Sequence, residues 1–131
     1  MENGRIKKFT DLIAWQEGHK LVLEVYGITD SFPRSEVFGL SNQMRRCSVS
    51  IVSNIAEGFS RGTLRDKNQF YAMALGSTTE LQSQLLIAKD LKYIDGEKFK
   101  KIADDSVLTH KLINGLIKGN NSKLKEGEKR N

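Results

Sequence analysis

Apolar residues recur every three or four positions along most of the chain, and this spacing limits the folds that the chain can adopt. Spacing of this kind is typical of amphipathic helices, whereas half-buried strands alternate apolar and polar residues. No segment shows sustained alternation. Pro33 is the only proline among 131 residues, which is not typical of a loop-rich or disordered chain. These features predict an all-α protein of one domain.

Four segments carry the helical spacing, and several of their ends have recognisable signals. Pro33 ends the first segment, because the residue before a proline avoids the α region. Thr63 and Asp66 have the spacing of a capping box at the start of the third, and Asp95 can cap the fourth. The connections are short, which predicts an antiparallel, up-down-up-down four-helix bundle. The segments cover residues 12–29, 40 to about 58, 63–88 and 95–117.

The net charge of +5 is located in the two ends of the chain. Residues 9–117 contain thirteen Lys and Arg against thirteen Asp and Glu. We therefore divide the chain into a basic N-terminal tail (1–8), the bundle (9–117) and a flexible basic C-terminal tail (118–131). Such tails are solubilising segments or binding arms. Their basic residues are Arg5, Lys7, Lys8, Lys118, Lys123, Lys125, Lys129 and Arg130.

The sequence has the character of a cytoplasmic protein. Its first ten residues, MENGRIKKFT, lack the apolar region of a signal peptide. No apolar run approaches the roughly 20 residues that cross a bilayer. Cys47 is the only cysteine, so no intrachain disulfide can form. We expect no membrane partner.

The serine-rich stretch SVSIVSNIAEGFSRGT, residues 48–63, resembles a catalytic or phosphate-binding segment at first sight. Its serines lie inside a predicted helix. There the backbone N–H groups that would bind a phosphate already donate to carbonyl oxygens of the helix. The only histidines, His19 and His110, form no motif with these serines. Glu17 and His19 are two residues apart and lie on different faces of a helix, unlike a Glu-x-x-His metal site. We predict a protein without catalytic activity, metal or cofactor.

The polar residues of the second and third segments are better explained as contacts between helices. Gly76, inside a helix, costs about 1 kcal/mol relative to alanine, so we expect close helix packing there. If the two helices pair about a turn at residues 61–64, Arg45 faces Glu80 and Arg46 is adjacent. We expect the two arginines to form an ion pair with Glu80. The predicted polar contact residues are Arg45, Arg46, Asn54, Glu57, Ser77 and Glu80.

These residues also carry a resemblance to a known family. The sequence SNIAEG at 53–58, preceded by two arginines and followed by GSTTE at 76–80, is similar to the four-helix-bundle proteins encoded in intervening sequences of bacterial 23S rRNA genes. The resemblance extends from Phe9 to about Lys118. The family often has proline where this chain has Val52, which predicts a straighter helix, and alanine where it has Cys47.

The resemblance implies a ring-shaped homopentamer. It also implies a relation to the accessory variability determinant of diversity-generating retroelements, which binds a reverse transcriptase and nucleic acid. The expected partners are therefore other copies of the chain, RNA or DNA, or a protein such as a nucleic-acid enzyme. The first helix independently favours oligomerisation, since its apolar face is wider than one core needs. That face contains Trp15, Leu21, Val25, Tyr26 and Ile28.

Arg61, Arg65 and Lys67 follow SNIAEG and are the candidate nucleic-acid contacts, although a solvated helix start has the same composition. In a ring they would repeat on one rim. We predict weak binding of RNA or DNA without sequence specificity, through this basic rim and the tails. The alternative function is a protein-interaction scaffold or accessory subunit with no direct nucleic-acid role, which the neutral charge of residues 9–117 favours.

Overall fold

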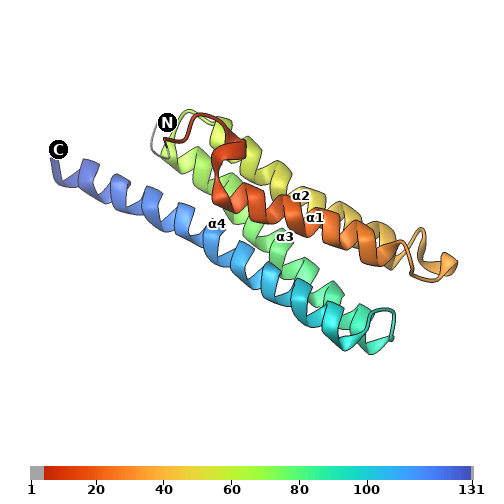
Figure 1. The fold of residues 1–131 in the computed structure, drawn as a ribbon. Helices are drawn as coiled ribbons and strands as arrows, with labels where there is room; N and C mark the ends of the chain where they lie inside the picture. The colour runs from red at the N-terminus through yellow and green to blue at the C-terminus, as the bar shows by residue number, and fades with distance from the viewer. Residues whose placement is uncertain (1–4, 131) are drawn as a thin grey trace.

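The computed structural model describes residues 5–130, without the side chain of Arg130, and shows four α-helices (Figure 1). No strand occurs within these residues, so the predicted all-α class is confirmed. The predicted tail residues 1–4, the Arg130 side chain and Asn131 lie outside this description. The helices are α1 (Ile13–Thr29), α2 (Leu40–Ser60), α3 (Leu64–Asp90) and α4 (Gly96–Arg130), with short 3-10 helices at Phe9–Asp11 and Arg34–Glu36.

Each α-helix packs against two others: α1 against α2 and α4, and α3 against α2 and α4. Two ion pairs join α1 to α4: Lys20 lies 3.6 Å from Asp105, and Glu24 lies 2.9 Å from Lys101. The four helices enclose one core.

The core is built from apolar side chains of all four helices. Leu21, Ile51, Leu81 and Ile113 are fully buried, one from each helix. Burying each such side chain stabilises the fold by about 1.5–3 kcal/mol. Hydroxyl groups inside the core bond to carbonyl oxygens three or four residues earlier, as Thr78 does to Ala74 at 2.8 Å. The four fully buried hydroxyls of the described residues, those of Ser48, Thr78, Ser106 and Thr109, are each bonded in this way.

The predicted starts of α3 and α4 are confirmed. Thr63 Oγ1 accepts a hydrogen bond from the Asp66 backbone N–H at 3.1 Å. Asp95 Oδ1 accepts one from the Lys98 backbone N–H at 2.8 Å. Each bond satisfies an N–H group that has no partner within the helix.

The end of α4 differs from the prediction. Residues 118–130, expected as a flexible tail, continue the helix, and Figure 1 shows them reaching past the other three helices. Lysine and glutamate are good helix formers, so a charged segment can continue a helix that the core has started. Asn68 on α3 also bonds Asn120 at 2.9 Å and Asn121 at 3.1 Å.

Two glycines show opposite environments at the contact of α2 and α3. A methyl group at Gly58 would lie 2.7 Å from Tyr71 Cε1 and 3.1 Å from the Lys67 carbonyl oxygen, so the two helices approach closely beside their turn. Gly76 was predicted at a close contact, but it is exposed and a methyl group there would have no atom within 4 Å. Packing within this chain therefore does not explain Gly76.

Candidate functional site

A polar seam joins the middle of α2 to the middle of α3. Ser50 Oγ and Ser77 Oγ lie 2.9 Å apart, and the Cys47 thiol donates to the Ser77 carbonyl oxygen at 3.0 Å. Asn54 supports Ser50 by donating to its carbonyl oxygen at 2.9 Å and to its hydroxyl at 3.1 Å. Glu57 lies further along and bonds within its own helix to Ser60. Ser50 is therefore the serine of residues 48–63 that links the two helices, whereas Ser48 and Ser60 bond within α2.

Cys47 has the properties of an inert thiol. The side chain is buried within this seam. Burial, together with the nearby Glu80 carboxylate, raises the pKa of the Cys47 thiol far above its ordinary value. Because the thiolate is the reactive form, Cys47 is a poor nucleophile.

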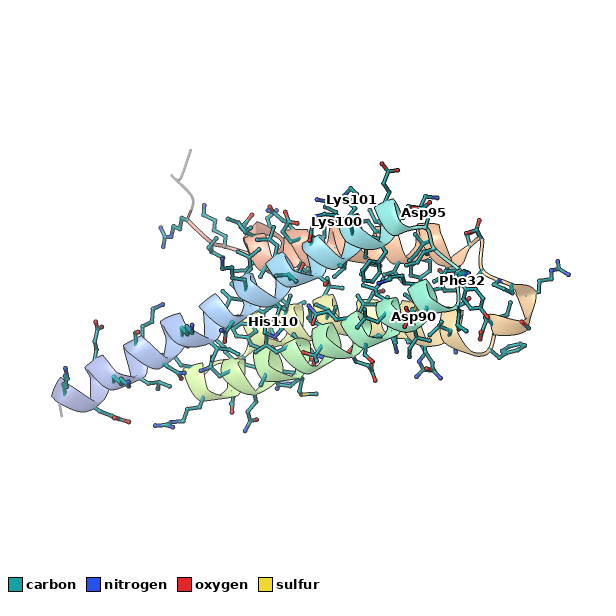
Figure 2. The ribbon with its side chains drawn as sticks, turned by 90° about the horizontal axis from the view of Figure 1, so that it is seen from below. Phe32, Asp90, Asp95, Lys100, Lys101 and His110 are labelled. Atoms are coloured by element: carbon teal, nitrogen blue, oxygen red, sulfur yellow. The ribbon has the colours of Figure 1, made fainter. Side chains whose placement is uncertain are left out.

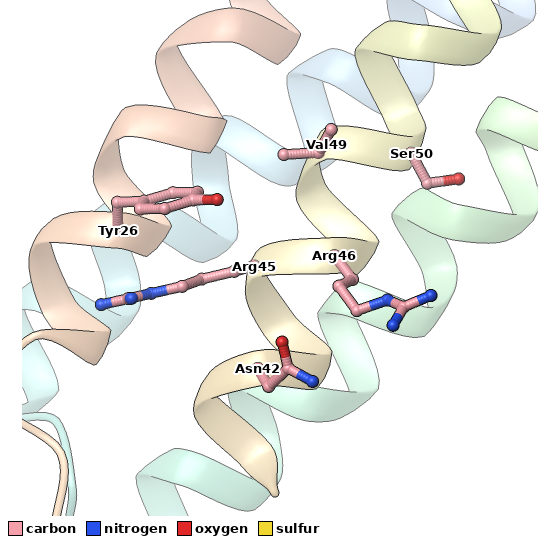
Figure 3. A pocket seen from close by; sticks show the side chains of 6 residues that line it. All are labelled: Tyr26, Asn42, Arg45, Arg46, Val49 and Ser50. Atoms are coloured by element: carbon pink, nitrogen blue, oxygen red, sulfur yellow. The ribbon is translucent and has the colours of Figure 1, made fainter. Parts of the chain in front are cut away.

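The predicted ion pair between Arg45 and Glu80 is not formed. Figure 3 shows Arg45 and Arg46 pointing to opposite sides of α2. Arg45 turns toward α1, where its Nε donates to Thr29 Oγ1 at 2.8 Å and its guanidinium lies 4.8 Å from the centre of the Tyr26 ring. Adjacent residues of a helix project about 100° apart, so one of the two had to turn away from α3.

Arg46 lies on the α3 side and lines a hollow together with Glu80. The two charged groups form no ion pair within 4 Å among the residues that the structure describes. Arg46 also lines a second hollow, of about 510 Å³, that extends over α2 as far as Tyr26 of α1 (Figure 3). That hollow is lined by Tyr26, Asn42, Arg45, Arg46, Val49 and Ser50. The two arginines and the Asn42 amide are groups that can bind and orient a ligand in such a hollow.

The three predicted nucleic-acid contacts lie together at the turn between α2 and α3, and each has a partner. Arg61 pairs with Glu57 at 3.6 Å and covers the Phe70 ring at 4.5 Å. Arg65 pairs with Glu128 at 3.6 Å, with both side chains more than 70% exposed. Lys67 donates to the Phe59 carbonyl oxygen. Such exposed pairs are weak and can exchange for phosphate.

Further basic residues gather at this same end of the molecule, which we call the basic end. Figure 1 places the N-terminal segment and the last part of α4 beside the α2–α3 turn. Lys111, Lys118 and Lys125 are exposed and seven residues apart, which places them on one face of α4 in a row that runs from the middle of the helix toward the basic end. This row was not predicted, because residues 118–131 were expected to form a flexible basic tail. Arg5, Lys7 and Lys8 are also exposed.

A charged cluster between α1 and α4 was not predicted. Lys101 Nζ lies 2.9 Å from Glu24 Oε2 and 3.0 Å from Asp105 Oδ2. Burial raises the pKa of Glu24. Burial would also raise the pKa of Asp105, but hydrogen bonds with Glu24 and Lys101 outweigh it and lower that pKa. No local pattern links residues 24 and 105, so only the fold reveals this cluster.

Neither histidine belongs to a cluster of metal ligands. His19 stacks on Trp15 with ring centres 4.8 Å apart, and Phe9 lies across the same indole at 5.4 Å. Residues 5–130 contain no group of three or more His, Cys, Asp or Glu placed to hold a metal ion. Over the same range no helix has a stretch long and apolar enough to cross a bilayer.

Four helices around one core, with no strand in the described residues, define a four-helix all-α protein. The family of 23S rRNA-intervening sequence proteins matches residues 10–115, and the chain belongs to this family. The fold is similar to the crystal structure of a protein of unknown function from the S23 ribosomal protein family of Bacteroides thetaiotaomicron. The TM-score is 0.75 at 22% identity, over 81% of this chain and 99% of that one. No curated protein matches.

Proposed function

We propose that this protein is a non-catalytic, cytoplasmic oligomer that binds RNA or DNA weakly and without sequence specificity through its basic end. The observation that carries the proposal is the row of Lys111, Lys118 and Lys125 on the exposed face of α4, beside the basic N-terminal segment. The separation of charge is a second support, since residues 9–117 are neutral overall and the excess lies at the two ends of the chain.

Lysine side chains on a helix surface favour phosphate contacts over base contacts. A lysine ammonium is a point charge that attracts any phosphate, and phosphates carry no sequence information. Consecutive lysines of the row are about 10 Å apart along the helix, given a rise of 1.5 Å per residue. Such a row can follow a flexible phosphate backbone without requiring one conformation of it.

We further propose that the helices form an antiparallel, up-down-up-down bundle and that the bundles assemble into a homo-oligomer, most simply the pentameric ring that the family resemblance implies. Trp15 no longer supports assembly, because it is partly covered by Phe9 and His19. Other exposed apolar residues support assembly. Leu86 and Val107 flank an apolar groove between α3 and α4, and Ile13 and Leu23 lie on α1. A ring needs two different patches on each subunit.

A protein partner is the second candidate function, and the same α3–α4 groove favours it. Leu85, Leu86, Phe99, Ala103 and Val107 line most of the groove, whose volume is about 230 Å³. An apolar groove accepts the apolar face of a helix from another protein. In this role the chain would be a scaffold or accessory subunit of, for example, a nucleic-acid enzyme.

The proposed function is tested by replacing lysines at one end of α4 and comparing the other end. Fluorescence anisotropy measures binding of two single-stranded 20-mers of unrelated sequence at low ionic strength, where screening is weakest. We expect the wild-type protein to bind both with similar affinity. The double variant Lys118→Ala/Lys125→Ala should weaken both equally, because two phosphate contacts are lost.

The matched control is Lys98→Ala/Lys100→Ala, which removes the same charge from the first turns of α4. Figure 2 shows Lys100 near Lys101 and Asp95, at the end of the molecule opposite to the basic end. This control should bind as the wild type does. If the wild-type protein binds neither 20-mer, nucleic-acid binding is wrong and the protein-partner function takes its place. Equal losses in the two double variants would show that net charge, and not the basic end, determines affinity.

A further inference from the structure

A second polar surface lies at the start of α2, at the end of the molecule away from the basic end. A hollow of about 470 Å³ opens between α2 and α3, with Phe38 at its rim. Phe38 is 93% exposed, more than any other large apolar side chain that the structure describes. The polar lining consists of Asn42, Gln43, Arg46, Ser50, Glu80 and Gln84. The lining therefore combines an aromatic ring, amides and charges of both signs.

Two of these groups, Gln84 Oε1 and the Arg46 guanidinium, have no hydrogen-bond or ion-pair partner among the residues that the structure describes. Gln84 is only 8% exposed, and its Oε1 is buried without a hydrogen-bond donor. Buried amide oxygens are nearly always bonded, so an orphan beside a hollow indicates a missing donor. Arg46 and Glu80 are exposed and form no ion pair within 4 Å in the described part of the chain. Glu80 lies beside the Cys47 thiol, whereas the Arg46 guanidinium and Gln84 Oε1 are left without a contact across the hollow.

The loop that carries Phe38 is held in place. Glu36 Oε1 accepts a hydrogen bond from the Leu40 backbone N–H at 3.2 Å, and Glu36 Oε2 accepts one from the Tyr93 hydroxyl at 2.8 Å. These bonds tie the start of α2 to the turn before α4. A fixed loop presents Phe38 at little entropic cost on binding.

We propose that this hollow binds one unpaired nucleobase of a single-stranded nucleic acid, with the base stacked on Phe38. The site rests on the proposed nucleic-acid function and adds a base contact to its phosphate contacts. Every base has a π-face that an aromatic ring can stack on. Amide groups donate to and accept from base edges, and the Glu80 carboxylate can accept from the amino group of cytosine, adenine or guanine. Arg46 is then placed for the adjoining phosphate.

The chemistry of the lining favours a base over the surface of another copy of the chain. Protein interfaces bury an apolar centre, and here the apolar groove lies elsewhere, between α3 and α4. The α2–α3 hollow has one exposed aromatic among polar groups, which is the composition of a stacking site with edge contacts. Its volume lies within the usual range for small-ligand pockets. A base in a duplex cannot enter it, so the site predicts a preference for single strands.

The test compares Phe38→Ala with Phe38→Trp and with Met73→Ala, an exposed apolar residue of α3. Fluorescence anisotropy at one fixed salt concentration measures binding of a labelled single-stranded 20-mer and of its duplex. Phe38→Ala should weaken single-strand binding about tenfold, since stacking on one aromatic contributes that order of affinity. Duplex binding should be unchanged, Phe38→Trp should retain single-strand affinity, and Met73→Ala should bind as the wild type does. Because Phe38 is exposed, its removal leaves the core intact.

The results distinguish a failure of the base site from a failure of the proposed nucleic-acid function. If Phe38→Ala keeps full single-strand affinity while the Lys118→Ala/Lys125→Ala variant loses it, the base site is wrong and the proposed function stands. If Phe38→Ala lowers the mass measured by light scattering and leaves single-strand affinity unchanged, the surface joins copies of the chain and the base site is again wrong. If the wild-type protein binds neither the single strand nor the duplex, both proposals are wrong.

Discussion

Gly58 and Gly76 belong to the same pair of helices and should respond oppositely to a methyl group. At Gly58 the new carbon would lie 2.7 Å from Tyr71 and 3.1 Å from a backbone oxygen. Gly58→Ala should therefore lower the free energy of unfolding by about 1–3 kcal/mol, as overpacking does. Gly76→Ala meets no neighbour and should raise it by up to about 1 kcal/mol through helix propensity. Urea denaturation measures both.

The pair of variants also tests whether Gly76 contacts another copy of the chain. A destabilising Gly76→Ala would contradict the open environment seen around that residue. If the loss of stability depended on protein concentration, the methyl group would be disturbing a contact between subunits, because only an assembly makes unfolding concentration-dependent.

Individual side-chain contacts were only partly predictable from the sequence. The spacing about a turn at 61–64 placed residues 47–50 opposite residues 75–78, and Ser50 does meet Ser77. The same reasoning placed Arg45 opposite Glu80, which is wrong, because Arg45 contacts α1 and Arg46 lies on the α3 side. Which arginine faces α3 depends on the rotation of α2 about its axis, which is fixed by packing of the whole core. Phe38 was missed because nothing in its local sequence marks it as exposed.

The contact between α1 and α4 should depend on pH through Glu24. Burial raises the pKa of Glu24 in the folded protein above the ordinary value of 4.5. A raised carboxyl pKa contributes stability below the unfolded pKa, and that contribution is lost as pH rises through the folded pKa. Glutamine does not titrate, so Glu24→Gln removes this pH-dependent loss of stability. The variant should therefore gain stability relative to the wild type between pH 4 and pH 7, measured by urea denaturation at both values.

Glu57→Gln is the control for this pH effect, because Glu57 is exposed and has a single ion-pair partner, Arg61. Its stability relative to the wild type should change little over the same range. If Glu24→Gln instead lost stability as pH rose, the ion pair of Glu24 with Lys101 would outweigh the burial of its carboxyl group.

The last part of α4 should be the least protected helical segment. Residues 122–130 extend past the other helices, and nearly all of their described side chains are exposed. Helical segments without tertiary packing open easily. Hydrogen exchange followed by mass spectrometry should show fast exchange over residues 122–130 and slow exchange over residues 102–113. Equally slow exchange in both ranges would indicate that another subunit covers the extension.

Helices were more predictable than their ends. Apolar periodicity placed all four, and Thr63 and Asp95 marked two of the starts correctly. The end of α4 was missed because the charged sequence after Lys118 contains no apolar face to signal a helix. Local helix propensity and the contacts of Asn68 with Asn120 and Asn121 continue it nonetheless.

Assembly would repeat each surface on every subunit and so increase affinity without any new contact. A weak phosphate-binding surface that occurs several times on one particle binds a long strand with greater avidity. We expect static light scattering at micromolar concentration to give a mass several times 14.8 kDa. A measured mass of one chain would contradict the proposed oligomer, and the exposed Leu86 and Val107 would then require another partner.

The family and the fold were predictable because SNIAEG and its surroundings are distinctive and the helical period is strong. The binding partner was not predictable, because the groups available for binding depend on which residues the fold brings together at the surface. The basic charge of the two tails was evident from the sequence. The row formed by Lys111, Lys118 and Lys125 was not, because it requires α4 to continue through residue 125.

The decisive measurement is the salt dependence of the affinity for a single-stranded 20-mer. Phosphate binding by the basic end predicts a linear fall of log affinity with log salt, with a slope of about −0.7 per phosphate contacted. Arg61→Ala/Arg65→Ala/Lys67→Ala and Lys118→Ala/Lys125→Ala should each flatten this slope, while Lys98→Ala/Lys100→Ala should keep it. A slope near zero in the wild-type protein, or the same slope in all variants, would contradict electrostatic binding at the basic end.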